Sequence, residues 1–190
     1  MNNKKNITAI ILAGGKSSRM GTDKGFVSYK NKPFVQHIID VVRPLVNEII
    51  IISNNPNYDI FGLKRFEDLV LDAGPLAGIY TGLHYSESEN NLVISCDVPL
   101  ISSELLELLI TEIDTTSEVI QLQSGDKKMP LIAIYKKSCE AKFSEALNLG
   151  ERRVRKALEQ CEVKTIVIKK ALEKHTANIN TKEDLKEIIE

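Results

Sequence analysis

Short runs of apolar, β-branched residues recur along the chain and alternate with stretches of helical periodicity. The runs expected to form strands cover residues 7–12, 48–53, 92–96, 118–123, 130–135 and 163–168. Several of these runs are continuously apolar, which is typical of strands that are covered on both faces. We therefore expect a sheet that lies between two layers of helices.

The spacing of apolar residues between these runs predicts the helices. One apolar stripe extends from Phe34 to Leu45, and its helix should end or kink at Pro44, because proline lacks the N–H that continues a helix. Further helices are expected at 76–85, at 102–113 with Ser102 and Ser103 as its cap, at 138–149, at 151–159 after a break at Gly150, and after a Thr181/Asp184 capping box.

Alternating strands and helices predict an α/β fold, a three-layer sandwich with a mostly parallel, Rossmann-like sheet. The segment 118–135 differs, because two strands follow each other across the short connection Ser124-Gly125-Asp126-Lys127-Lys128. Such spacing predicts a hairpin, or an antiparallel edge region of the sheet. With 190 residues, of which 43% are apolar, the sequence suits a single domain over residues 1–190.

Charge and composition narrow the class of protein. The net charge is −1, from 25 basic and 26 acidic side chains, which argues against nucleic acid or an anionic membrane as a partner. No apolar run approaches the roughly 20 residues of a spanning helix, and the N-terminus lacks the pattern of a signal peptide. The sequence therefore predicts a cytoplasmic protein.

The residues after the first predicted strand are a candidate anion site: Leu12-Ala13-Gly14-Gly15-Lys16-Ser17-Ser18-Arg19-Met20-Gly21-Thr22-Asp23-Lys24-Gly25. Glycines let backbone N–H groups approach an anion closely, and Lys16, Arg19 and Lys24 add positive charge for a triphosphate. A Walker A loop is disfavoured because Ile10 stands where that motif needs glycine, and a G-x-G-x-x-G fingerprint fails at Lys16. The alternative is a solvated surface loop.

Two carboxylates are expected near this loop. Asp97 follows the predicted strand 92–96, and ligands of open α/β sheets bind beyond the carboxyl ends of the strands. Mg²⁺ prefers one or two carboxylates together with phosphate oxygens, so Asp97 is a candidate metal ligand, with a turn-forming Asp as the alternative. Asp68 precedes a Gly/Pro-rich loop and is a candidate acceptor for a ribose or base, with a solvated surface acid as the alternative.

Two later segments carry candidate contacts for a second substrate. Arg152 and Arg153 belong to a group of cations at 152–156, placed where a helix is expected to start. Cations are unfavourable there unless an anion binds, so a phosphate-bearing acceptor or a solvated basic face are the two interpretations. Asn178 and Asn180 form a turn and cap, or their amides hydrogen-bond a heterocycle.

Together these segments resemble the molybdenum cofactor guanylyltransferases. The resemblance rests on Leu-Ala-Gly-Gly-Lys-Ser-x-Arg-Met-Gly-x-Asp-Lys at 12–24, Gly-Pro-Leu-Ala-Gly at 74–78, Cys-Asp-x-Pro at 96–99, Gly-Glu-Arg-Arg-Val at 150–154 and Asn-x-Asn-Thr at 178–181. The motifs follow the family's order over nearly the whole chain. The first motif is shared with the wider nucleotidyltransferase superfamily, including sugar-nucleotide and cytidylyl enzymes, and the later motifs narrow the match.

The resemblance implies an Mg²⁺-dependent transfer of GMP from GTP to molybdopterin carrying molybdenum, with release of pyrophosphate. It implies nucleotide contacts at Leu12, Ala13, Gly14, Lys24 and Asp68, with Mg²⁺ on Asp97. To these we add Gly15 and Lys16 as nucleotide-binding residues, Arg19 with Lys24 and Asp97 as catalytic residues, and Arg152, Arg153, Asn178 and Asn180 as acceptor-binding residues.

Other features of the family find less direct counterparts. Some members use an Asn after the second strand, where this chain offers both Asn54 and Asn55, and Met129-Pro130 stands where members often have His-Pro. Expected partners are molybdenum-insertion proteins and apo-molybdoenzymes or their chaperones. Two alternatives stay open: a cytidylyl- or adenylyltransferase acting on molybdopterin or another phosphorylated acceptor, and a non-catalytic protein that binds and delivers molybdopterin or nucleotide.

Overall fold

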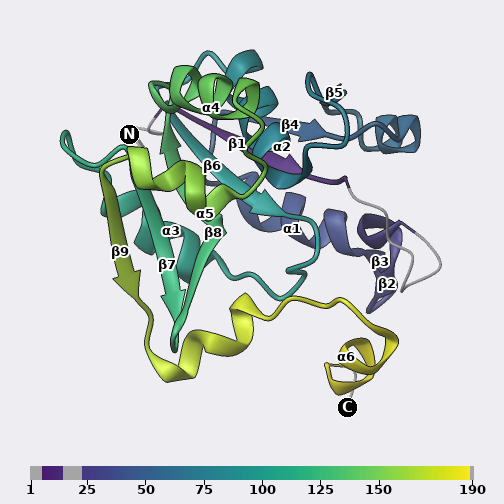
Figure 1. Cartoon of the computed structure of the whole chain (residues 1–190). Coiled ribbons are helices and arrows are strands. Elements are labelled where there is room, and N and C mark those ends of the chain that lie inside the picture. Colours follow the sequence, from purple (N-terminus) through teal and green to yellow (C-terminus); the bar gives the residue numbers. More distant parts are fainter. Residues whose placement is uncertain (1–5, 15–22, 189–190) are drawn as a thin grey trace.

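A seven-stranded sheet forms the centre of the molecule in the computed structural model, which describes residues 6–14 and 23–188 (Figure 1). Its strand order is β5-β4-β1-β6-β8-β7-β9. The strands are β1 (Ile7–Leu12), β4 (Glu48–Ile52), β5 (Lys64–Phe66), β6 (Asn90–Ser95), β7 (Val119–Ser124), β8 (Lys127–Lys136) and β9 (Val163–Val167).

Six of these strands run in one direction, because β8 alone is antiparallel to its neighbours β6 and β7, while β9 is parallel to β7. Strands β7 and β8 form the predicted hairpin, in which Ser124 pairs with Lys127. Gly125 in the turn has a φ of +54°, a conformation that costs glycine little. The predicted mostly parallel sheet with an antiparallel region toward one edge is confirmed.

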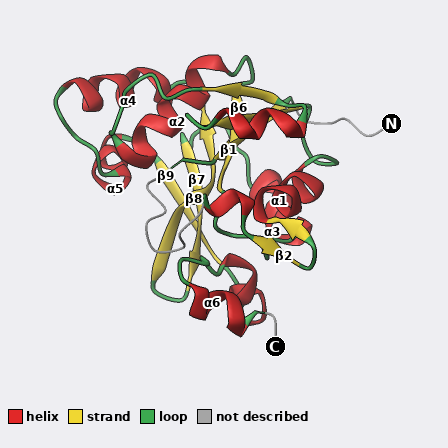
Figure 2. Cartoon of the chain, turned by 90° about the vertical axis from the view of Figure 1, so that its right-hand side faces the viewer, coloured by secondary structure: helices red, strands yellow, loops and turns green. Residues whose placement is uncertain are grey.

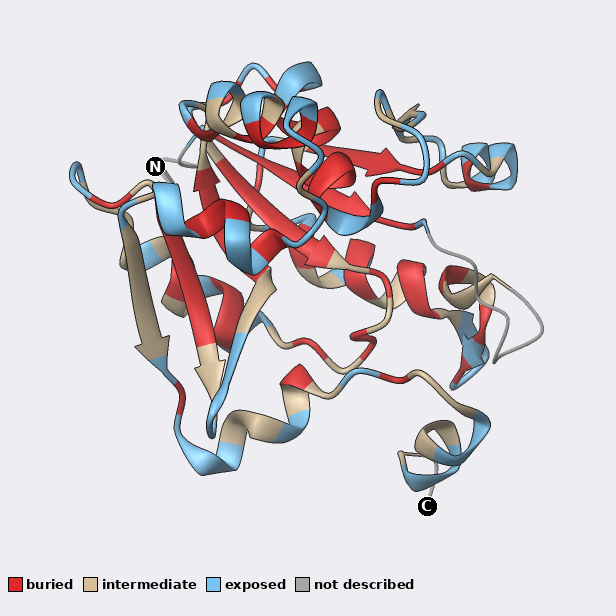
Figure 3. Cartoon of the chain, in the orientation of Figure 1, coloured by how far each residue is buried: buried red, intermediate tan, exposed pale blue. Residues whose placement is uncertain are grey.

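Helices cover both faces of the sheet (Figure 2). Helices α1 (Phe34–Val42) and α3 (Ser103–Thr111) pack on one face, whereas α2 (Gly74–Tyr85), α4 (Cys139–Asn148) and α5 (Val154–Ala157) pack on the other. The central strands are buried along most of their length (Figure 3), as their continuous apolar runs predict. The predicted three-layer sandwich is confirmed.

Most helix boundaries agree with the predictions. Helix α1 ends two residues before Pro44, and Thr181 and Asp184 form both hydrogen bonds of a capping box at the start of α6 (Lys182–Glu187). Ser102 is the N-cap residue of α3 by position, but its buried hydroxyl makes no hydrogen bond within the described residues. Helix α5 is shorter than the predicted 151–159 and begins at Val154.

A second, smaller apolar cluster joins the chain's end to the segment after the glycine-rich loop. There β2 (Ser28–Tyr29) and β3 (Lys32–Pro33) form a small hairpin. Val27, Tyr29 and Phe34 pack with Ile179, and Leu185 of α6 packs against them. The C-terminal segment is thereby held beside residues 27–34. Within 6–14 and 23–188, no helix is both long enough and apolar enough to span a membrane.

Candidate active site

The carboxyl ends of β4, β1 and β6 lie side by side. Leu12 pairs with Ile52 on one side and with Ser95 on the other. The N–H of Cys96 donates to the Leu12 carbonyl at 3.0 Å, which extends this pairing past the last residue of β6. Gly14 and Asp97 therefore follow the ends of their strands at the same edge of the sheet. Open α/β sheets bind their ligands at this edge.

Lys24 and Asp97 meet at this edge. The Nζ of Lys24 lies 3.4 Å from Oδ2 of Asp97, and it also donates to the side-chain oxygen of Asn180. Asn178 donates from Nδ2 to Oδ1 of Asp97 at 3.0 Å. Both ends of the ion pair are largely shielded, with 24% of the Lys24 side chain and 13% of the Asp97 side chain exposed. Their interaction is therefore screened less than that of a surface pair.

The backbone of the C-terminal segment fixes this cluster. The N–H of Ile179 donates to the Asp97 carbonyl at 2.8 Å, and the Ile179 side chain is buried. The N–H of Asn180 donates to the Asp184 carboxylate at 2.7 Å, a hydrogen bond that contributes most to lowering the pKa of Asp184. Asn178 and Asn180 were predicted as acceptor contacts, and the structure brings both to Asp97 and Lys24.

A pocket of about 910 Å³ opens next to these strand ends. Its wall combines the ends of β1, β4 and β6 with the start of α2. The lining residues are Leu12, Gly14, Ile52, Asn54, Asp68, Asp72, Ala73, Gly74, Pro75, Gly78, Ser95 and Leu131. The size and the mixed apolar and polar wall suit a small organic ligand such as a nucleoside.

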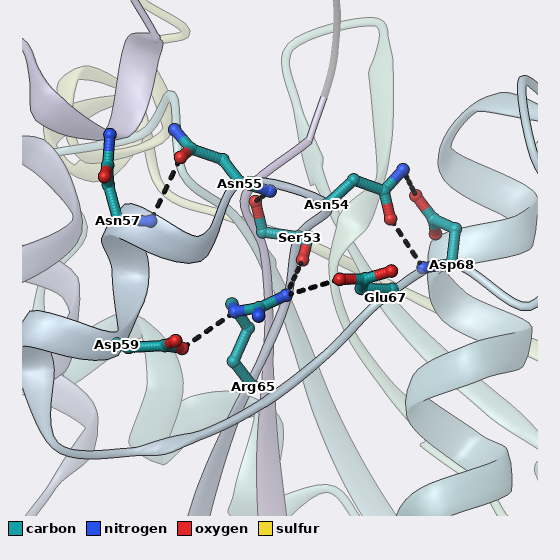
Figure 4. A network of polar contacts seen from close by, with 8 residues as sticks. All are labelled: Ser53, Asn54, Asn55, Asn57, Asp59, Arg65, Glu67 and Asp68. Atoms are coloured by element: carbon teal, nitrogen blue, oxygen red, sulfur yellow. Dashed lines mark hydrogen bonds and ion pairs between the residues drawn. The ribbon is translucent and has the colours of Figure 1, made fainter.

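Asp68 reaches into this pocket and is held by Asn54 (Figure 4). The side-chain oxygen of Asn54 accepts from the N–H of Asp68 at 2.9 Å, and its Nδ2 lies 3.4 Å from Asp68 Oδ2. Burial raises the pKa of Asp68. Asn54 thus faces the pocket, whereas Asn55 turns its amide to Asp23, so the two candidate asparagines occupy different places.

Arg65 of β5 holds the segment that carries Asn54 through hydrogen bonds. Its Nη1 donates to the carbonyl of Ser53 at 2.8 Å, and its Nε donates to Asp59 at 2.8 Å (Figure 4). The run Lys64-Arg65-Phe66 was missed as a strand, because two of its three residues are charged. Arg65 nevertheless has a defined place at the sheet's edge, with 14% of its side chain exposed.

Arg152 and Arg153 line a separate hollow of about 610 Å³ between the end of α4 and α5. Arg152 donates to the carbonyl of Leu147 at 2.9 Å, and Arg153 pairs with both carboxylate oxygens of Glu151 at 3.0 Å. The backbone oxygen of Arg152 would lie 4.0 Å from a Cβ on Gly74, so this segment borders the nucleoside-sized pocket. The hydrogen bonds that Arg152 and Arg153 donate join this segment to itself and to the end of α4.

Four cations at the start of a helix would be electrostatically unfavourable, but α5 starts too late for this to apply. Arg152 and Arg153 precede the helix, while Arg155 and Lys156 lie in its last turn, where the helix dipole favours positive charge. These cations therefore need no bound anion to explain their positions.

Three predicted site residues, Gly15, Lys16 and Arg19, lie outside the described residues. Within the described part of the chain, no group of three or more His, Cys, Asp and Glu side chains is placed to hold a metal ion. Mg²⁺ sites in proteins often use one or two carboxylates, with phosphate and water as the remaining ligands.

The mostly parallel sheet is followed after its first strand by a glycine-rich segment, and a lysine and a carboxylate meet at the strand ends beside a pocket. Together these features characterise a nucleotide-binding α/β domain. The chain belongs to the family of MobA-like NTP transferase domains, whose family model matches residues 9–165.

Individual relatives extend the match. A protein of Flavobacterium johnsoniae named "Probable molybdenum cofactor guanylyltransferase" is 39% identical over 182 residues, covering 96% of both chains. The "Molybdenum cofactor guanylyltransferase" of Shewanella halifaxensis is 36% identical over 153 residues, covering 78% of this chain and 76% of that protein. The solved structure of molybdopterin-guanine dinucleotide biosynthesis protein A from Archaeoglobus fulgidus superposes with a TM-score of 0.79 at 22% identity, covering 96% of both chains. At that identity, the structural likeness shows the fold alone.

Proposed function

We propose that this chain transfers GMP from GTP to the terminal phosphate of molybdopterin carrying molybdenum, forming the guanine dinucleotide cofactor and pyrophosphate. The names of the relatives and the family support the reaction class and both substrates. The observation that carries the proposal is the contact between Lys24 and Asp97 at 3.4 Å, beside a pocket large enough for a nucleoside.

The guanosine would occupy the pocket, with the backbone of Leu12, Ala13 and Gly14 beneath it. Gly74 and Gly78 both line this pocket. Gly78 lets α2 lie close to the end of β1, because a Cβ there would lie 3.1 Å from Cδ2 of Leu12. The Asp68 carboxylate, oriented by Asn54, would accept hydrogen bonds from the ribose. Lys24 and the preceding loop, with Gly15, Lys16 and Arg19, would face the triphosphate.

The reaction needs no strong general base. A phosphate monoester has a second pKa of about 6, so the terminal phosphate of the acceptor is already largely a dianion at neutral pH. One of its oxygens attacks the α-phosphorus of GTP, the bond between this phosphorus and the bridging oxygen breaks, and pyrophosphate leaves with that electron pair. Catalysis then depends on alignment and on cations near the developing charge.

Asp97 would hold Mg²⁺, and a bound Mg²⁺ supplies charge neutralisation to the triphosphate. Lys24 would leave Asp97 Oδ2 for the phosphates, a short movement for a side chain already at the same strand ends. Asn178 keeps the Asp97 carboxylate oriented through its hydrogen bond to Oδ1. Asn178 and Asn180, with Arg152 and Arg153, stay our candidates for acceptor contacts.

We place the reaction in the cytoplasm, where GTP is made, and expect molybdenum-insertion proteins to supply the acceptor and apo-molybdoenzymes or their chaperones to receive the product. The near-neutral net charge of −1 supports small-molecule and protein partners over nucleic acid.

A nucleotide-selectivity assay tests the proposal. Pyrophosphate release is measured with Mg²⁺, the molybdopterin acceptor, and GTP, CTP or ATP in turn. The proposal expects release with GTP that depends on both acceptor and Mg²⁺. Faster release with CTP or ATP would replace it with a cytidylyl- or adenylyltransferase, and tight binding without any release would replace it with a delivery protein.

A further inference from the structure

Asp23, near the end of the glycine-rich segment 12–25, is held by three donors. Its Oδ1 accepts from the hydroxyl of Tyr58 at 2.5 Å and from the N–H of Gly25 at 3.1 Å, and its Oδ2 accepts from Nδ2 of Asn55 at 3.0 Å. A carboxylate with three donors is strongly oriented, since hydrogen bonds to a charged group are roughly twice as strong as neutral ones.

Tyr58 is built into the core beneath this carboxylate. The residue is fully buried, and its ring lies 4.6 Å from that of Phe26, measured between centroids. Burial is the main cause that raises the pKa of the Tyr58 hydroxyl far above its usual value, so the hydroxyl stays protonated and available to donate. Replacing it with hydrogen would leave Asp23 one donor short and change little else in the packing.

Gly25 shows how closely the two segments fit. A Cβ on Gly25 would lie 2.9 Å from Cε1 and Cζ of Tyr58 and still closer to the hydroxyl oxygen. Real Cβ atoms do not approach so closely, and the buried ring cannot give way. The backbone of Lys24 therefore lies between two points that are both held by Tyr58, namely the Asp23 carboxylate and the Gly25 Cα.

Asn55 completes the support from the same segment. It is the N-cap of the 3₁₀ helix Pro56–Phe61, with its side-chain oxygen accepting from the N–H of Asn57 at 3.1 Å while its Nδ2 holds Asp23. The 3₁₀ helix thus presents two donors at a fixed spacing to one carboxylate. The Asn55 amide is thereby engaged with Asp23 rather than with the pocket.

We propose that Tyr58 is a positioning residue, which, together with Asn55, holds Asp23 and thereby directs the side chain of Lys24 toward the bound phosphates. Tyr58 itself touches no substrate. The inference rests on the proposed function in one respect, that Lys24 binds the nucleotide's phosphates. The bracing of the Lys24 backbone does not depend on it.

The test compares Tyr58→Phe with Thr8→Val. Both substitutions delete one buried hydroxyl, and Thr8, whose hydroxyl lies 2.9 Å from that of Ser88, is at the opposite end of β1 from the site. Two measurements need no catalysis: hydrogen exchange of the Gly25 amide, which donates to Asp23, and the labelling rate of Lys24 by an amine reagent. A third is the dissociation constant of GTP with Mg²⁺.

Tyr58→Phe should speed Gly25 exchange by about 10-fold, as expected for one hydrogen bond to a charged group, and alter Lys24 labelling, whereas Thr8→Val should change neither. GTP should bind about 10-fold more weakly to Tyr58→Phe, since small misplacements of a binding group are costly. In an Asp23→Ala background, Tyr58→Phe should add less than about a twofold effect, because residues that act through one another are not additive.

Asn55→Asp serves as the second variant, because it keeps the acceptor for the 3₁₀ helix and replaces the donor to Asp23 with a repelling oxygen. It should shift all three measurements in the same direction as Tyr58→Phe. Gly25 exchange equal to that of Thr8→Val would overturn the bracing. Faster exchange with an unchanged GTP dissociation constant would overturn its link to nucleotide binding. A chain that proves to transfer no GMP would leave the exchange and labelling results standing.

Discussion

The ammonium group of Lys24 lies 3.4 Å from a carboxylate oxygen of Asp97, a residue 73 positions further along the chain. The contact joins the end of the segment after β1 with the end of β6, and the C-terminal Asn178 and Asn180 hold its two partners. A cation and a carboxylate held together at strand ends, beside a pocket, are suited to a polyphosphate and its divalent ion. The C-terminal segment is therefore as much a part of the candidate site as the sheet.

Replacing Asp97 with alanine should lower turnover by about 10²–10³, the usual cost of removing a key electrostatic group from such a site. The fold should stay intact, because the backbone hydrogen bond from Ile179 to the Asp97 carbonyl needs no side chain. Pyrophosphate release and thermal unfolding are the two measurements. Asp126→Ala, in the exposed hairpin turn, is the matched control and should keep full activity. Near-normal turnover of Asp97→Ala with Mg²⁺ would refute the metal assignment.

Two glycines of α2, one helical turn apart, should respond oppositely to alanine. A Cβ on Gly78 would face the pocket, 3.7 Å from Oδ1 of Asp68. Gly78→Ala should weaken GTP binding by about 10-fold. Its stability should change little, because the helix preference of alanine over glycine, about 1 kcal/mol, offsets the 3.1 Å contact of the new Cβ with Cδ2 of Leu12.

Gly82 points into the core instead, where a Cβ would lie 2.9 Å from Cδ1 of Ile10 and closer to its Cγ2. Gly82→Ala should therefore lower the free energy of unfolding by about 1–3 kcal/mol, the usual cost of overpacking, and leave GTP affinity unchanged in the folded fraction. Urea titration and GTP binding on both variants give the comparison. Equal effects of the two substitutions on GTP affinity would mean that the pocket is not the nucleoside site.

The sequence predicted the strands that are buried and the residues that directly follow them. Continuous apolar runs identified β1, β4 and β6, and the rule that ligands bind beyond strand ends identified Asp97 and Gly14 before any contact was known. It missed β5, because Lys64-Arg65-Phe66 forms a strand only through pairing with β4. A strand this short at the edge of a sheet forms because it pairs with the neighbouring strand. Its own three residues show no apolar/polar alternation that would predict it.

The contacts that hold the site residues in place could not be predicted from the sequence. Asp23 was part of a recognised motif, but its bond to Tyr58 crosses 35 positions and depends on how a 3₁₀ helix packs against Gly25. The cations at 152–156 were placed at a helix start, with a bound phosphate or a solvated basic face as the two interpretations. The structure instead starts α5 at Val154, and Glu151 pairs with Arg153. A charge pattern does not show where a helix starts when a local ion pair precedes it.

Lys137 should contribute to stability through the end of α2. Its ammonium group donates to the carbonyls of Leu83, His84 and Ser86, and it pairs with Glu140 at 2.9 Å. Lys137→Ala should lower the free energy of unfolding by about 1–3 kcal/mol, because these terminal carbonyls lose a charged donor. Lys64→Ala is the control. Its ion pair with Glu48 is exposed and should contribute little to stability. Chemical denaturation of both variants measures the free energies of unfolding. An equal decrease in the two variants would contradict this role of Lys137.

The segment before α5 should make stability depend on pH through Glu151. Its carboxylate accepts from the side chain of Arg153 and from the N–H groups of Arg153 and Arg152, which lowers the pKa of Glu151 from its usual 4.5 to about 2. A carboxyl group whose pKa is lower in the folded state stabilises the fold above the unfolded value and loses that contribution as the pH falls toward the folded one. Glu151→Gln should therefore melt below the wild type at neutral pH, and the difference should shrink between about pH 4.5 and pH 2. Arg153→Gln removes the side chain that lowers the pKa of Glu151 most, so its loss of stability should fade over the same pH range. A melting difference between wild type and Glu151→Gln that persists unchanged down to pH 2 would show that the ionised form of Glu151 is not what stabilises this segment.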